Sequence, residues 1–219
     1  MSSPAPVRSS ARRAEPGRSG LLFHAIDCFA RHGYAGASID RIARAAGVTK
    51  GAVYYHFRDK QQLLFASVKD CISTFESAVM ARVERLDDPR DALAEVATMC
   101  ADIARDDNHR RFILTLMVEA LDTHPELEAE FQAMMQRFRA FQAHLIRRGQ
   151  QQRLFRAAVN PDAAAEAFVA GILGAELQYY QDSKAVDVRR TVAVQVEQTL
   201  AWLAHPDRSK GRQRSHGGS

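Results

Sequence analysis

The stretch from Ser38 to Lys60, SIDRIARAAGVTKGAVYYHFRDK, constrains the fold of this 219-residue chain more than any other part of it. Its first half carries apolar residues at the i, i+3, i+4 and i+7 spacing of one helix face, namely Ile39, Ile42, Ala43 and Ala46. Ser38 precedes them, and its hydroxyl can cap a helix start by accepting a bond from a backbone N–H. Gly47 follows them, where helices often end in a left-handed residue. The pattern predicts one short, capped helix.

The second half of the stretch predicts another short helix directly after the turn. Thr49 is a second capping residue, and the helix is expected to run from Lys50 to about His56. Two short helices joined by a tight turn form a helix-turn-helix motif, whose second helix can enter the major groove of DNA. The sequence therefore predicts a DNA-reading element.

Residues from about Leu21 to Leu64 resemble the DNA-binding domain of the tetracycline-repressor (TetR) family of bacterial transcriptional regulators. The matching residues are Phe29, Gly33, Tyr34, Ile39, Ile42, Ala43, Ala46, Gly47, Val48, Gly51, Tyr54, Phe57, Lys60, Leu63 and Leu64. They agree in one register over the first third of the chain. The remainder shares only the all-helical character of the family.

The resemblance implies which residues read DNA. It places Lys50, Gly51, Ala52 and Tyr54 on the side of the second helix that faces the groove. Lysine can donate to guanine O6 or N7, and small residues allow close approach to the bases. Residues near helix starts or with polar tips are expected to contact phosphates: Ser38, Thr49, Tyr55, His56 and Lys60.

Core packing is the alternative for the aromatic residues of this helix. It is the expectation for Phe57 and an equal alternative for Tyr54. Asp40 departs from the pattern, since an acidic side chain near the DNA backbone weakens binding unless Arg41 or Arg44 offsets its charge.

The charge distribution supports a nucleic-acid partner. Residues 1–60 contain ten basic and four acidic residues, a net charge of +6, which leaves −2 for the rest of a chain whose total is +4. Contacts to phosphate supply most non-specific DNA affinity, so a basic first segment suits a DNA-binding domain. A solvated basic surface is the alternative on charge alone.

Helical patterns continue along the chain and predict an all-α fold of about nine helices. After a first helix ending near Gly33 and the two helices of the motif, we expect helices at 59–86, 89–105, 109–121, 125–148, 161–181 and 186–204, with Gly149 ending the fourth of these six. The expected organisation is a disordered basic arm at 1–18, the helix-turn-helix domain at 19–64, a helical effector-binding and dimerisation domain at 65–205, and a disordered tail at 206–219.

The last two helices are expected to pair with a second copy of the chain. They combine small and apolar residues, which allow helices to approach closely, and in the TetR family the corresponding helices form a four-helix bundle between two subunits. The expected interface consists of Ala164, Phe168, Gly171, Gly174, Ala175, Val192, Val196 and Leu200. The alternative is a monomer in which these residues pack only against their own chain.

The middle helices are rich in methionine and phenylalanine, which adapt to apolar ligands. Members of the family bind small molecules between such helices, so the resemblance implies an effector pocket. Its expected residues are Phe75, Met99, Phe112, Leu116, Met117, Glu119, Met134, Met135, Phe138 and Phe168. Plain core packing is the alternative for each, and Glu119 can equally face solvent.

These observations predict a cytoplasmic, nucleoid-associated homodimer that binds double-stranded DNA and a small-molecule effector, most simply a repressor. An activator, a ligand-independent regulator and a ligand-binding protein without DNA affinity remain alternatives.

No HExxH, P-loop, GxGxxG or GxSxG motif occurs, and the cysteines are too scattered for a metal site. We therefore expect no catalysis, no cofactor and no metal. No apolar run approaches the roughly 20 residues that span a bilayer.

Overall fold

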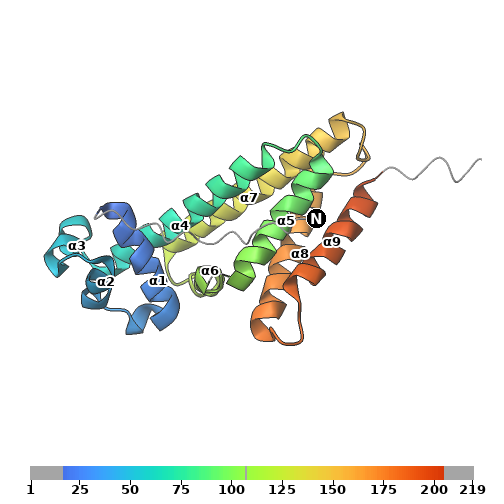
Figure 1. Cartoon of the computed structure of the whole chain (residues 1–219). Coiled ribbons are helices and arrows are strands. Elements are labelled where there is room, and N and C mark those ends of the chain that lie inside the picture. Colours follow the sequence, from blue (N-terminus) through green and yellow to red (C-terminus); the bar gives the residue numbers. More distant parts are fainter. Residues whose placement is uncertain (1–16, 107, 205–219) are drawn as a thin grey trace, which may run out of the picture. The chain divides into compact units, whose positions relative to one another are not determined.

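The computed structural model describes residues 17–106 and 108–204, which form the helices shown in Figure 1. Their bounds are α1 Arg18–Gly36, α2 Ile39–Ala46, α3 Lys50–His56, α4 Lys60–Val83, α5 Pro89–Asp106, α6 Asn108–Glu119, α7 Pro125–Gln151, α8 Pro161–Gln181 and α9 Val188–Leu203. Over these residues the only extended pairing is an isolated bridge between Phe155 and Ala204. The predicted all-α fold is confirmed.

The predicted terminal segments fall almost entirely outside the described residues. Of the basic arm, only Gly17 and Arg18 are described; Gly17 precedes α1, and Arg18 is its first residue. The predicted tail at 206–219 lies outside the described part of the chain.

The described residues divide into two compact units. The head unit comprises residues 17–75 and 108–127, and the body unit comprises residues 76–106 and 128–204. Helix α4 contributes Lys60–Phe75 to the head unit and its remaining residues to the body unit. The domain boundary at residue 64 stays a prediction.

The head unit is built on α1, which packs against both α2 and α6, while α2 packs against α3. Large side chains from these helices and from the start of α4 are fully buried, among them Leu22, Phe29, Ile42, Val53 and Leu63. Asp59 caps α4 by accepting a 2.7 Å bond from the backbone N–H of Gln62. This bond lowers the pKa of Asp59, with Arg58 as the second cause.

In the body unit, α9 packs against α5 and α8. Arg147 of α7 donates to Asp162 of α8 at 2.6 Å, and Arg189 of α9 donates to Asp102 of α5 at 2.5 Å. None of the helices in the described ranges is both long enough and apolar enough to cross a bilayer.

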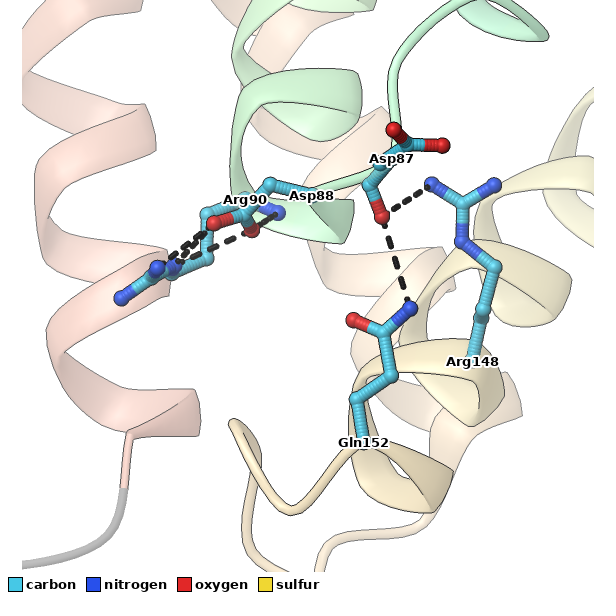
Figure 2. A network of polar contacts seen from close by, with 5 residues as sticks. All are labelled: Asp87, Asp88, Arg90, Arg148 and Gln152. Carbon is cyan, nitrogen blue, oxygen red and sulfur yellow. Dashed lines mark hydrogen bonds and ion pairs between the residues drawn. The ribbon is translucent and has the colours of Figure 1, made fainter.

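Hydrogen bonds connect the turn between α4 and α5 to the end of α7. Figure 2 shows Arg148 and Gln152 converging on the backbone oxygen of Asp87, each at 3.4 Å. Arg148 also donates to the backbone oxygen of Leu86 at 2.8 Å. Within the turn, the Asp88 carboxylate accepts from the Arg90 guanidinium at 3.0 Å, and this hydrogen bond is the main cause of the lowered pKa of Asp88.

The helix ends differ from the predictions at two glycines. Gly33 adopts φ +67°, which breaks the helical path as expected, but helical residues continue after it to Gly36. The predicted helix end at Gly149 is wrong, because α7 continues to Gln151. A Cβ atom at Gly149 would lie 2.1 Å from the ring of Phe155, so this glycine makes room for a buried aromatic side chain. The left-handed residue that follows α7 is Arg153, at φ +60°.

Candidate nucleic-acid interface

The turn between α2 and α3 has the geometry that its sequence predicts. The Ser38 hydroxyl accepts from the backbone N–H of Arg41 at 3.2 Å. Gly47 is left-handed at φ +69°, its N–H donates to the Arg44 oxygen, and the N–H of Val48 donates to the Ala43 oxygen at 3.0 Å. These two backbone bonds are those of a Schellman motif, which ends α2 and fixes where α3 begins.

Helix α3 has one buried edge and one exposed face. Val53 and the following Phe57 are buried, so the predicted core role of Phe57 is confirmed. The Thr49 hydroxyl accepts from the backbone N–H of Ala52 at 3.1 Å and orders the first turn. Tyr54 is 49% exposed and Tyr55 is 86% exposed, and Lys50 and Gly51 are exposed as well. The structure therefore presents the predicted base-facing residues to solvent, with Ala52 half-buried.

Lys50 is not free on this surface. Its ammonium donates to the Asp40 carboxylate of α2 at 2.9 Å, and both side chains are about half exposed. This hydrogen bond raises the pKa of Lys50, and the negative charge of Asp40 adds to the effect. The residue that offsets Asp40 is thus Lys50 rather than the predicted Arg41 or Arg44. The two residues are ten positions apart on different helices, so no local pattern in the sequence indicates the pair.

Lys60, which is predicted to contact phosphate, has partners within its own chain. Its ammonium donates to the backbone oxygens of Tyr34 and Ala37, at 2.8 and 3.1 Å, and lies 4.2 Å from the centre of the Tyr34 ring. Carbonyl oxygens at the end of α1 would otherwise lack partners. Lys60 therefore joins the start of α4 to the end of α1.

The other predicted phosphate contacts belong to the two caps and to the end of α3: Ser38, Thr49, Tyr55 and His56. Arg44 was not predicted as a phosphate contact, yet it is exposed in the last turn of α2 and makes no ion pair with the described residues. An exposed arginine beside the turn is the signal that could have indicated it.

The residues predicted to form the dimer interface differ in how deeply they are buried. Ala164, Phe168, Ala175, Val192 and Val196 are buried within a single chain. Their assignment to the interface stays a prediction. Gly171 also faces its own chain, because a Cβ atom there would lie 2.5 Å from the Gln195 side chain of α9. Leu200 is half-buried, and a Cβ atom added at Gly174 would meet no neighbouring atom within 4 Å.

A different face of α8 is exposed. It carries five small or apolar residues at the i, i+4, i+7, i+11 and i+14 spacing of one helix face, and we call them the outer stripe: Ala163, Ala167, Ala170, Gly174 and Leu177. Leu177 is 58% exposed, and on α9 Val194 and Trp202 are each about half exposed.

The predicted pocket residues belong to both units. Those of the head unit are Phe75, Phe112, Leu116, Met117 and Glu119, and those of the body unit are Met99, Met134, Met135, Phe138 and Phe168. Leu116, Met134 and Phe168 are buried. Glu119 is exposed, which corresponds to its alternative solvent-facing position. Phe75 lies under the Arg110 guanidinium, 5.6 Å from the ring centre.

Two family models match the chain. The model described as "Bacterial regulatory proteins, tetR family" matches residues 21–67, which contain α2, α3 and most of α1. The model described as "Tetracyclin repressor-like, C-terminal domain" matches residues 111–193. Together they cover more than half of the chain. The chain belongs to the TetR family. Membership places it among regulatory proteins rather than enzymes.

Individual TetR-family relatives agree with this assignment. The repressor AcnR of Corynebacterium glutamicum is 39% identical over 66 residues, which are 30% of this chain and 32% of AcnR. The A-factor receptor protein of Streptomyces griseus is 28% identical over 206 residues, covering 91% of this chain and 68% of that protein. The chain spans about three tenths of the length of the first curated relatives that it matches. The structure of SmeT, the repressor of the Stenotrophomonas maltophilia multidrug efflux pump SmeDEF, superposes with a TM-score of 0.71 at 24% identity, covering 87% of this chain and 92% of SmeT.

Proposed function

We propose that the chain is a homodimeric transcriptional repressor that leaves a palindromic DNA operator when a small, mostly apolar effector binds. The observation that carries this proposal is the exposed face of α3, held by two side-chain caps and a Schellman turn over a buried edge of Val53 and Phe57. The names of AcnR and SmeT, both repressors, and of the A-factor receptor support the same function.

In this proposal α3 enters the major groove. Lys50 and Tyr54 reach base edges, while Gly51 and Ala52 let the backbone come close. Ser38, Thr49, Tyr55 and His56 contact phosphates or sugars and set the register of the head unit on the duplex. Arg44, exposed beside the turn, adds a phosphate contact.

Two copies of the chain pair through the outer stripe of α8. Small residues at this spacing allow two helices to pack closely, and Leu177 supplies apolar area at one end of the stripe. Val194 and Trp202 of α9 extend the apolar surface. A two-fold dimer presents two α3 helices to two half-sites about one helical turn apart, so the expected operator is palindromic.

The effector acts by shifting a population of dimers between two arrangements of their α3 helices. It binds among the methionine and phenylalanine side chains of the body unit, such as Met134, Met135 and Phe138. Helix α4 is the physical link, since the same continuous helix belongs to both units. A protein that binds genomic DNA acts where that DNA is, so we place it at the nucleoid in the bacterial cytoplasm.

The test is binding of the purified full-length chain to DNA from upstream of its own gene, measured by fluorescence anisotropy over a range of salt concentrations. We expect a preference for a palindrome of about 10³-fold or more over a scrambled duplex. The logarithm of the binding constant should fall linearly with the logarithm of the salt concentration. Lys50→Ala combined with Tyr54→Ala should abolish the preference.

Lys184→Ala is the matched control, because Lys184 is an exposed lysine in the loop before α9 of the body unit. It should leave the preference unchanged. Equal affinity for both duplexes would instead indicate a non-specific DNA protein, and no binding to either would indicate a ligand-binding protein without DNA affinity. Transcription in vitro from the bound promoter separates a repressor from an activator.

A further inference from the structure

Three polar side chains are buried in the part of the chain that the structure describes: Ser67, Gln142 and Glu176. The Ser67 hydroxyl donates to backbone oxygens one turn earlier in α4, at 2.7 Å to Leu63 and 3.0 Å to Leu64. Glu176 is engaged in an interaction of its own. Gln142, on α7, is completely buried, and neither its Nε2 nor its Oε1 has a partner among the described residues.

Gln142 differs from the other side chains with a buried polar atom that lacks a hydrogen bond, because both polar atoms of its amide lack one. Arg148 and Arg156 each donate to a backbone oxygen through another nitrogen, and Gln195 donates to the backbone oxygen of Phe168 at 3.2 Å. Glu95 pairs with Arg82, and Tyr180 also has an interaction. In Gln142 the whole amide, with two N–H donors and one carbonyl acceptor, is left without protein partners among the residues described.

The surroundings of the amide on its own helix are mostly apolar. One turn away on the same face of α7 lie Phe138, Arg139, Leu145 and Ile146; the last two are buried, and Phe138 and Arg139 are half-buried. A buried amide without hydrogen bonds destabilises a protein, because nothing offsets the loss of its hydration, and native proteins rarely keep one. An apolar residue of similar length would avoid this cost, so the glutamine needs another explanation.

We infer that Gln142 is the specificity-determining residue of the effector site, and that it selects an uncharged polar group, such as a hydroxyl or carboxamide, on an otherwise apolar molecule. The inference rests on the proposed function, which supplies the effector. A carboxamide satisfies the Gln142 amide from both sides, by accepting from Nε2 and donating to Oε1. A charged group is excluded because the amide brings no opposite charge to offset the loss of its hydration. The adaptable Phe138 and neighbouring Met135 make contact with the apolar body.

The test uses four probes with one eight-carbon tail: octanamide, 1-octanol, octanoate and octylammonium. Binding to the full-length chain is measured by calorimetry and by the rise in Tm, since a ligand that binds only the folded state stabilises it. We expect octanamide and octanol to bind and the two charged probes to give no shift. Gln142→Met should weaken octanamide binding by about tenfold, the loss of a hydrogen-bonded pair, while leaving any binding of the tail.

A matched substitution on the same helix separates this role from a structural one. Gln150 is also on α7, but its Nε2 donates to the backbone oxygens of Arg156 and Val159, at 2.9 and 2.8 Å. Gln150→Met should therefore lower the Tm of the unliganded chain by about 2–8 °C, whereas Gln142→Met should leave it unchanged or raise it.

Three outcomes would overturn the inference. Gln142→Met could lower the Tm as much as Gln150→Met, which would show that Gln142 has a structural partner such as a bound water. The wild-type chain could prefer a charged probe or bind none. Wild type and Gln142→Met could bind the probes alike. Probe binding is measured without DNA, so failure of the proposed DNA-binding function is seen separately, in the anisotropy experiment.

Discussion

Asp40 places a carboxylate beside the helix that is proposed to read DNA, where a negative charge opposes binding. Its hydrogen bond to Lys50, at 2.9 Å, joins the first turn of α2 to the first residue of α3. An exposed ion pair of this kind contributes little to stability, because solvent screens both charges. That is too little to hold the fold, but enough to influence how readily the lysine turns to a base or a phosphate.

Asp40→Asn should therefore strengthen binding to DNA of unrelated sequence by about two- to fivefold, because it removes a repulsive charge and releases Lys50. The slope of log K against log salt should become steeper by about 0.9, the value of one additional phosphate contact. Anisotropy titrations on a scrambled duplex at several salt concentrations measure both quantities.

Asp27→Asn is the control for Asp40→Asn. Asp27 is also paired with a basic side chain of the head unit, accepting from Arg31 at 2.9 Å, but both residues lie on α1. Asp27→Asn should change the slope of log K against log salt little. Repeating Asp40→Asn in a Lys50→Ala background tests the coupling directly; an undiminished gain there would mean that Asp40 acts by its charge alone.

At the scale of single elements, the end of α7 depends on the absence of a side chain at Gly149. The ring of Phe155, which is fully buried, occupies the space where a Cβ atom would lie. The backbone oxygen of Gly149 also accepts from the N–H groups of Leu154 and Phe155, at 2.9 and 3.2 Å. The chain thus folds back over this glycine directly after the helix ends.

Gly149→Ala should destabilise the chain by about 1–3 kcal/mol, the usual cost of overpacking a buried site, although alanine favours helix more than glycine does. Thermal unfolding followed by circular dichroism measures the change. Gly51→Ala is the comparison, because the nearest atom to its Cβ position is 3.8 Å away; it should leave the Tm unchanged or raise it slightly. Equal Tm values for both variants would contradict the packing role of Gly149.

The helix-turn-helix could be predicted almost residue by residue, because its signals are local. Ser38, Gly47 and Thr49 each act within a few residues of their own position, and the structure gives all three the expected geometry. The pairs Asp40–Lys50 and Lys60–Tyr34 could not be predicted, since each depends on how separate helices pack.

The buried face of α8 could not be predicted from the sequence either. This helix carries alanine, glycine and large apolar residues on nearly all sides, so its pattern does not separate a buried face from an exposed one. The structure buries Ala164, Phe168 and Ala175 within the chain and leaves the outer stripe exposed, except for the half-buried Gly174. The prediction at Gly149 was wrong for a related reason, because a glycine needed for packing and one that ends a helix look the same in sequence.

At the scale of the whole molecule, the proposed contact through the outer stripe would join two chains, so that their two α3 helices act together. Leu177→Glu should place a charge in the proposed contact between α8 helices and convert the dimer to a monomer, because a buried unpaired charge destabilises an interface strongly. Light scattering after size-exclusion chromatography measures the mass of the assembly. Affinity for the palindrome should then fall to that of a single half-site.

Met80→Glu is the matched control, since Met80 of α4 is exposed to a similar degree, 47% against 58% for Leu177. It should leave both the mass and the DNA affinity unchanged. A Leu177→Glu protein that remains dimeric would show that the two copies meet through another surface.

The ion pair between Asp40 and Lys50 has a consequence for the time that the protein needs to find its operator. A regulator spends most of its search bound loosely to random DNA, sliding and hopping along it. Each added phosphate contact lengthens every such visit. A lysine that stays with its own carboxylate during these visits shortens them, so each molecule samples more of the chromosome per second. The acidic residue that weakens binding at equilibrium would then make the search faster.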